Sequence, residues 1–247
     1  MLAAADKARV CAASNADLHG AVFRAHGLNR QRNPLLWWSE SPAPPYYSNV
    51  TTLDPDAIEA QHQAVKQLSS ALDGPFAVKD GFCRLDLASL GFKLLFRASW
   101  TWANPSRAAA GAHSRMPFGW ERIRDPDALR AWEDAWAEDN PRDRRVFPPA
   151  ILDNPDIAFF GCASAGGFDA GCIVNRSPGA VGPSNVFANG VGAATAYQDA
   201  TRVAAIYADD LPLVGYEHGD ALHAARVAGF EPVGGLCVWL RHSERAA

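Results

Sequence analysis

The sequence predicts an α+β (mixed α/β) fold in which two similar halves each form a mixed, mostly antiparallel sheet flanked by helices. The tripeptide Ser-Asn-Val occurs at residues 48–50 and again at 184–186. Gly-Phe follows each copy at a similar distance, at 91–92 and 229–230. Between these markers both halves show the same order of hydrophobic periodicities, strand–helix–strand–helix–strand, which favours a tandem duplication over one irregular domain.

The first half is predicted from its alternating and helical patterns of apolar residues. Tyr46 to Thr52 alternates as a strand does. We expect Asp54 to be the N-cap of the next helix and Pro55 its first residue, where the missing N–H has no cost. The other expected elements are an opening helix at 17–25, a helix body at 58–72, a strand at 76–78, a short helix at 85–90 and a strand at 93–102.

The second half is predicted to open with an amphipathic helix at 125–136 and to add a hairpin that turns at Ala165-Gly166-Gly167. A linker is predicted from Pro105 to Pro117, where Ala, Gly, Ser and Arg are frequent. We therefore assign residues 1–110 to the first half and residues 117–247 to the second. After the hairpin we expect strands at 185–188, 211–216 and 235–241, and helices at 194–208 and 220–228.

Composition excludes several functional classes. The chain has 247 residues, 48% of them hydrophobic, which allows a core that needs no metal or disulfide. Its 23 Lys and Arg residues stand against 27 Asp and Glu residues without any cluster of like charge, which argues against a nucleic-acid or membrane-surface partner. The lack of a long apolar run, the charges at Asp6 and Lys7 and five scattered cysteines predict a cytoplasmic protein.

A glycine-containing turn follows the second Ser-Asn-Val strand. Asn189-Gly190-Val191-Gly192-Ala193-Ala194 connects this strand to the next helix. Such a turn leaves N–H groups of the helix start unpaired, keeps side chains small and lies at the positive end of the helix dipole, so it suits a diphosphate. The alternative is a tight strand-to-helix turn that binds nothing.

Residues 118–245 resemble the GNAT superfamily of acyl-CoA-dependent N-acyltransferases. The order of elements is similar, and Leu213 to Val233 looks like the family's passage from a strand through a helix to Gly-Phe. The family's pyrophosphate cradle starts with Gln or Arg, whereas Asn189 stands here, and the match holds from Gly190 onward. The resemblance implies acetyl-CoA (coenzyme A) as cosubstrate, bound by Val186, Phe187, Ala188, Asn189, Gly190, Val191, Gly192, Ala193 and Ala194.

The first half resembles the same fold but lacks this cradle. The segment from Thr51 to Asp56 stands where the glycines would be, and its two carboxylates and its proline disfavour a phosphate. We therefore expect the first half to be degenerate, with a structural or substrate-shaping role.

The resemblance also implies direct transfer of an acyl group from a thioester to an amine. Such a site needs a base, an oxyanion donor and an acid for the departing thiolate. The oxyanion donor would come from the strand at Val186 to Ala188. The family often places a tyrosine acid at the position of Ala225 and an asparagine at the position of His218, so neither usual residue is present.

Substitutes for these groups stand at the end of the predicted strand at 211–216. Glu217 is the candidate base, and Tyr216 or His218 is the candidate acid. The alternative is that Tyr216 belongs to the core and that Glu217 and His218 are solvated turn residues. Tyr197 and Tyr207 face the same choice, with a core role favoured.

The leading hypothesis is an N-acetyltransferase that moves an acetyl group from acetyl-CoA to a small-molecule or peptide amine. The alternative is a catalytically inactive GNAT-fold protein that binds a ligand or partner. A third hypothesis, a purely structural protein, predicts a filled channel between the strands at Val186 and Val214. No metal site is expected, because His218 and His223 do not share a helical face and no cysteine lies near them. The sequence leaves homodimerisation open.

Overall fold

One mixed sheet runs through the part of the chain that the computed structural model describes, residues 2–104, 115–137 and 145–242. The strand order in this sheet is β1-β2-β3-β4-β11-β5-β10-β9-β8-β7-β6. Only the pairs β3–β4 and β9–β10 are parallel within it. The strands are β1 (Gln31–Arg32), β2 (Leu36–Trp38), β3 (Val50–Thr52), β4 (Phe76–Asp80), β5 (Lys93–Ala103), β6 (Trp120–Ile123), β7 (Ile157–Ser164), β8 (Gly167–Ser177), β9 (Ala180–Ala188), β10 (Leu213–Glu217) and β11 (Glu231–Arg241).

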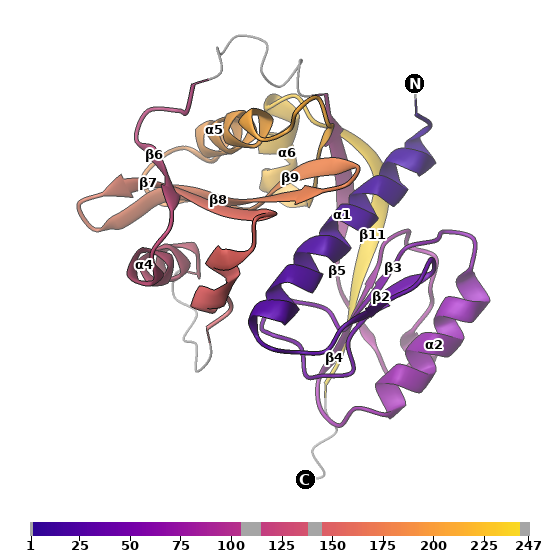
Figure 1. The fold of residues 1–247 in the computed structure, drawn as a ribbon. Coiled ribbons are helices and arrows are strands. Elements are labelled where there is room, and N and C mark those ends of the chain that lie inside the picture. Colours follow the sequence, from indigo (N-terminus) through magenta and orange to yellow (C-terminus); the bar gives the residue numbers. More distant parts are fainter. Residues whose placement is uncertain (1, 105–114, 138–144, 243–247) are drawn as a thin grey trace.

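The two long strands β5 and β11 lie side by side at the centre of this sheet (Figure 1). The antiparallel pair β4–β11 on one side is repeated by β10–β5 on the other. The parallel pair β3–β4 is likewise repeated by β9–β10. The final strand of each half therefore pairs with the penultimate strand of the other half. The duplicated order expected from the sequence is present, and the central pair β5–β11 joins both halves. The predicted linker falls mostly at residues 105–114, outside the described residues, so the domain boundary stays a prediction.

Helices cover both faces of the sheet. Phe159 of β7 packs with Trp132, whereas its neighbour Phe160 packs in the cluster that contains Ala200, so alternate side chains serve opposite faces. Figure 1 shows α1 crossing in front of the central strands, between the two halves. The helices are α1 (Ala4–Ala25), α2 (Ile58–Ser70), η1 (Ala88–Leu90), α4 (Pro126–Ala137), η2 (Pro149–Asp153), α5 (Ala193–Ile206) and α6 (Gly219–Val227).

Three predicted boundaries in the first half are wrong for local reasons. Helix α1 begins at Ala4, not at 17, because small residues such as Ala8 and Ala12 let its first turns pack closely on the central strands. Helix α2 begins at Ile58, because the Asp54 carboxylate accepts the N–H of Asp56 in a turn and does not cap the helix.

The third wrong boundary is the start of the strand expected from Tyr46 to Thr52. The observed strand, β3, begins only at Val50. Tyr46 has a φ of 68°, which is turn geometry, so regular pairing with β4 begins only at Val50.

No helix in the described part of the chain combines the length and the apolar character that crossing a bilayer requires.

Candidate functional site

A cleft opens where the parallel strands β9 and β10 separate. All of β10 pairs with β5, whereas its pairing with β9 is confined to Leu213 and Val181 at the start of the strand. The register between β8 and β9 shifts near Ile173, and Asn185 has a φ of 51°, so β9 carries a bulge at this point. A cavity of about 510 Å³ lies beyond it, between Val186 on β9 and Val214 on β10. These strands are apart, so the closed channel expected of a purely structural protein is not found.

Glu217 ends β10 and faces this cavity. The Tyr197 hydroxyl of α5 donates a hydrogen bond to Glu217 Oε1 over 3.2 Å. Burial raises the pKa of Glu217 to about 7, and the hydrogen bond from Tyr197 only partly offsets this rise. A carboxylate with this pKa exchanges a proton readily near neutral pH, as a general base must. Tyr197 is a core residue, as the sequence favoured, and also positions Glu217.

Tyr216 and His218 line the same cavity but differ in their surroundings. Tyr216 is half-buried, its ring meets Trp100 edge-on at 5.6 Å, and burial raises its pKa to about 12. His218 is the exposed N-cap residue of α6, and its ring centroid lies 5.1 Å from that of Phe96. The structure therefore brings together the three side chains selected from the sequence. Ala225 is fully buried.

The glycine turn divides into two parts with different roles. The N–H groups of Asn189 and Gly190 donate to the Asp169 carbonyl, and the Asn189 side chain donates to the Ala135 carbonyl of α4. A Cβ on Gly190 would lie 2.4 Å from Asp169 Cγ, so glycine is required there. Asn189 thus fixes the turn to α4, and the first two N–H groups of the turn are already in use.

The second part of the turn, from Val191 to the first residues of α5, is exposed. Gly192 is the N-cap of α5, and no side chain caps the helix. A Cβ on Gly192 would meet nothing nearer than Thr195 Oγ1 at 3.9 Å, so the space beside these N–H groups is open. Uncapped N–H groups beside open space at the start of a 14-residue helix fit a phosphate group. A diphosphate cosubstrate therefore fits Gly192 to Ala194 better than Asn189 and Gly190.

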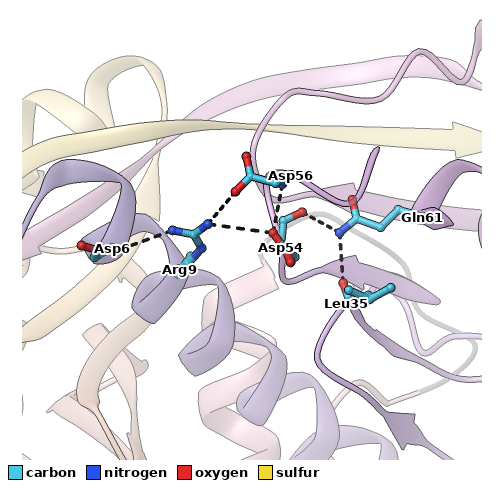
Figure 2. Close-up of polar contacts among 6 residues, drawn as sticks. All are labelled: Asp6, Arg9, Leu35, Asp54, Asp56 and Gln61. Carbon is cyan, nitrogen blue, oxygen red and sulfur yellow. Dashed lines mark hydrogen bonds and ion pairs between the residues drawn. The ribbon is translucent and has the colours of Figure 1, made fainter. Parts of the chain in front are cut away.

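The segment of the first half that corresponds to the glycine turn contains carboxylates that pair with an arginine of α1 (Figure 2). Arg9 of α1 reaches Asp56 at 2.9 Å and Asp54 at 3.9 Å. The Gln61 side chain donates to the backbone carbonyls of Asp54 and Leu35. The positive charge that an anion would seek is already neutralised by carboxylates at this turn.

The cavity also contains residues that were not selected from the sequence. Lys79 of β4 lies only 3% exposed, and its Nζ is 4.3 Å from the centre of the Tyr216 ring. Asn15 and His19 of α1 contact the same ammonium. One lysine in a short strand gives no sequence signal of burial, and only the pairing of β4 with β11 brings it into the second half's cavity. Among the described residues, no three His, Cys, Asp or Glu side chains lie together as a metal site would require.

Comparisons with known proteins identify the fold. No family model and no curated relative matches this sequence. Solved structures do match: a GCN5-related N-acetyltransferase from Kribbella flavida has a TM-score of 0.58 and 15% identity over 94% of this chain and 95% of that one. A GNAT-family protein from Novosphingobium aromaticivorans has a TM-score of 0.58 and 12% identity, over 91% and 96% of the two chains.

A conserved protein of unknown function from Staphylococcus epidermidis is also similar, with a TM-score of 0.56 and 10% identity over 87% of this chain and 94% of that one. The chain therefore has the GNAT fold, as the resemblance in its second half predicted. Identities this low establish the fold and leave activity to the chemistry of the site.

Proposed function

We propose that this chain is an acyl-CoA-dependent N-acetyltransferase that acts on a small-molecule or peptide amine. The observation that carries the proposal is the open cleft between β9 and β10, with Glu217 inside it and the uncapped start of α5 following β9. Acetyl-CoA would supply the acetyl group as a thioester. The fold supports this general class of chemistry, because its solved neighbours include N-acetyltransferases.

The backbone would hold the cosubstrate. The N–H groups of Gly192 to Ala194 would bind the diphosphate, with help from the helix dipole of α5. The edge of β9 from Val186 to Ala188 pairs with β8 on one side and is not covered by β10 on the other, so backbone groups on the open side would bind the pantetheine and the thioester carbonyl. No arginine or lysine is needed for these contacts.

Glu217 would accept a proton from the acceptor ammonium, which frees the nitrogen lone pair for attack. Its pKa of about 7 keeps a large fraction deprotonated at neutral pH. Tyr216, with a raised pKa, stays protonated and can donate a proton to the departing thiolate. His218, which is exposed at the start of α6, is the other candidate acid.

Isothermal titration with acetyl-CoA tests the cosubstrate. We expect one binding event per chain, lost in Gly192→Glu, whose side chain would place a negative charge beside the α5 N–H groups. The space beside Gly192 accommodates this side chain, so we expect the variant to fold as the wild type does. Gly179→Glu in the β8–β9 turn, which adds the same charge beside Val10, should bind normally. Absence of binding to the wild-type chain at millimolar acetyl-CoA would overturn the proposal.

A second function, binding without turnover, is favoured by one observation: buried Ala225 stands where the family often has its tyrosine acid. Thiol release from acetyl-CoA, followed over a panel of amines, separates the two functions. Release that depends on an amine supports the transferase. Acetyl-CoA binding with no release for any amine supports the inactive ligand-binding protein.

A further inference from the structure

The cavity has a second polar end, on the face of the sheet that α1 covers. The Lys79 ammonium donates to Asn15 Oδ1 over 2.7 Å, and its Nζ lies 3.3 Å from His19 Nε2. Its third neighbour is the ring of Tyr216, at 4.3 Å. All three contacts are with groups that carry no negative charge.

Lys79 therefore lacks a counter-ion within the described structure. Burial alone lowers its pKa to about 7, and no nearby carboxylate offsets this effect. A buried cation is normally paired with an anion, because the isolated charge is costly to desolvate. A site that keeps an unpaired ammonium at the wall of a cavity is suited to an anion that arrives with a ligand.

Two hydroxyl groups at the same cavity lack partners. Tyr47 Oη and Ser184 Oγ are buried, and no described residue forms a hydrogen bond with either. The Tyr47 ring packs edge-on against His19, with 4.9 Å between ring centroids, so it belongs to the cluster around Lys79. Buried hydroxyl groups are usually satisfied, and both of these residues belong to the lining of the cavity.

We propose that the acceptor is an amino-acid-like molecule, whose carboxylate binds the Lys79 ammonium and the Tyr47 hydroxyl while its amine faces Glu217. This inference rests on the proposed function. Lys79 reaches the cavity from the α1 face of β4, whereas Glu217 reaches it from the α5 side at the end of β10. The end of the cavity at Lys79 therefore favours an anionic group, and the end at Glu217 favours a cationic one. A single cation with no arginine in the described lining matches a carboxylate better than a doubly charged phosphate.

Matched pairs of probes test this assignment: L-amino acids and the corresponding L-amino-acid amides, each with acetyl-CoA and read by thiol release. We expect the wild-type chain to prefer the acids, by roughly ten- to a hundredfold in kcat/KM, because a charged hydrogen bond is lost in the amides. Lys79→Met should abolish the preference, because it slows the acids far more than the amides. Tyr47→Phe should reduce the preference less. Lys66→Met, on the exposed side of α2, should keep it.

A binding measurement separates failure of this inference from failure of the proposed function. Lys7, Lys66, Lys79 and Lys93 are the lysines of the chain, so the ¹³Cε signal of Lys79 can be assigned with Lys79→Met. We expect L-amino acids to raise the titration midpoint of this signal and the amides to leave it in place, whether or not turnover occurs. Equal turnover of acids and amides, or a Lys79 signal that no acid of the panel shifts, overturns the inference.

Discussion

The two halves use the same tripeptide to opposite effect. In the first half, Asn49 closes the sheet: its side chain accepts the N–H of Ala77 and donates to the Ser41 carbonyl, and its backbone N–H donates to the Ala77 carbonyl. In the second half, Asn185 has a φ of 51° and lines the cavity between β9 and β10. The first half has side-chain hydrogen bonds from Asn49 where the second half has a bulge at Asn185. This local difference distinguishes the closed sheet of the first half from the open cleft of the second.

The carboxylates at the ends of β4 and β10, Asp80 and Glu217, show the same contrast between the two halves. Asp80 pairs with Cys237 as Glu217 pairs with Ser99, so the two acids hold equivalent places in β4 and β10. Asp80 accepts the N–H groups of Phe82 and Leu85 and holds the next loop. Among the described residues, Glu217 accepts a hydrogen bond from the Tyr197 hydroxyl alone, and it faces the cavity. The carboxylate at this position therefore stabilises a loop in the first half, whereas in the second half it remains available for chemistry.

The largest effect that would sharpen this contrast is on turnover. Glu217→Gln should lower kcat by roughly a hundredfold or more, because the amine loses its base. In the wild-type chain kcat/KM should rise with pH through about 7, as Glu217 loses its proton, and this rise should disappear in the variant. The measurement is thiol release between pH 5.5 and 8.5.

Asp80→Asn is the matched control for that variant. We expect a lower melting temperature, since Asp80 holds the loop after β4, and kcat within a few-fold of the wild type. A larger loss of kcat in Asp80→Asn than in Glu217→Gln would contradict the assigned roles.

The next effect concerns stability and Lys79. Its pKa is lowered from 10.5 to about 7 on folding, so between these values the unfolded chain binds the extra proton and stability rises with pH. Lys79→Met removes this dependence. The stability of this variant relative to the wild type should therefore be highest below pH 7 and fall by about 4 kcal/mol between pH 7 and pH 10.5. Urea unfolding of both proteins at several pH values measures this difference, and a constant difference would show that Lys79 is not buried as an unpaired cation.

A smaller effect compares the two asparagines directly. Asn49→Ala should destabilise the chain by about 1–3 kcal/mol, because the Ala77 N–H and the Ser41 carbonyl lose their partner in a buried place. Asn185→Ala loses no such bond to any described residue, and its cost should stay near 1 kcal/mol, from the left-handed backbone that asparagine tolerates better than alanine. Denaturation midpoints show which variant is less stable. A larger loss of stability in Asn185→Ala would contradict the structural role proposed for Asn49.

The smallest effect is expected at the charged turn of Figure 2. Arg9→Met removes the cation that faces Asp6, Asp54 and Asp56, all partly exposed. Ion pairs of this kind contribute below about 1 kcal/mol, and less at high salt. We expect a small loss of stability in low salt that fades in 1 M NaCl. A loss that persists unchanged at high salt would indicate that Arg9 packs rather than pairs.

Sequence reasoning predicted the elements that have a strong local signal. The helix at 194–208 and the strand at 235–241 correspond to α5 (Ala193–Ile206) and the end of β11, because apolar periodicity and glycine stops act within a few residues. The placement of β11 between β4 and β5 was not predicted, because periodicity does not specify a strand's partner. Asp54 shows a further limit, since an aspartate before a helix can close a turn as well as cap.

The candidate site divides in the same way. Glu217, Tyr216 and His218 follow one another in the chain, so one strand end brings them to the cavity together. Lys79 comes from the other half and reaches Tyr216 only through the shared strand pair β5–β11. A contact between elements so distant in sequence has no signature in a single chain.

A crystal structure with acetyl-CoA tests the central claim most directly. We expect one cosubstrate per chain, with its diphosphate at the N–H groups of Gly192 to Ala194 and its thioester between Val186 and Glu217. The turn that contains Asp54 and Asp56 should be empty. Density for acetyl-CoA at that turn of the first half, or anywhere other than between β9 and β10, would show that the second half does not bind the cosubstrate as proposed.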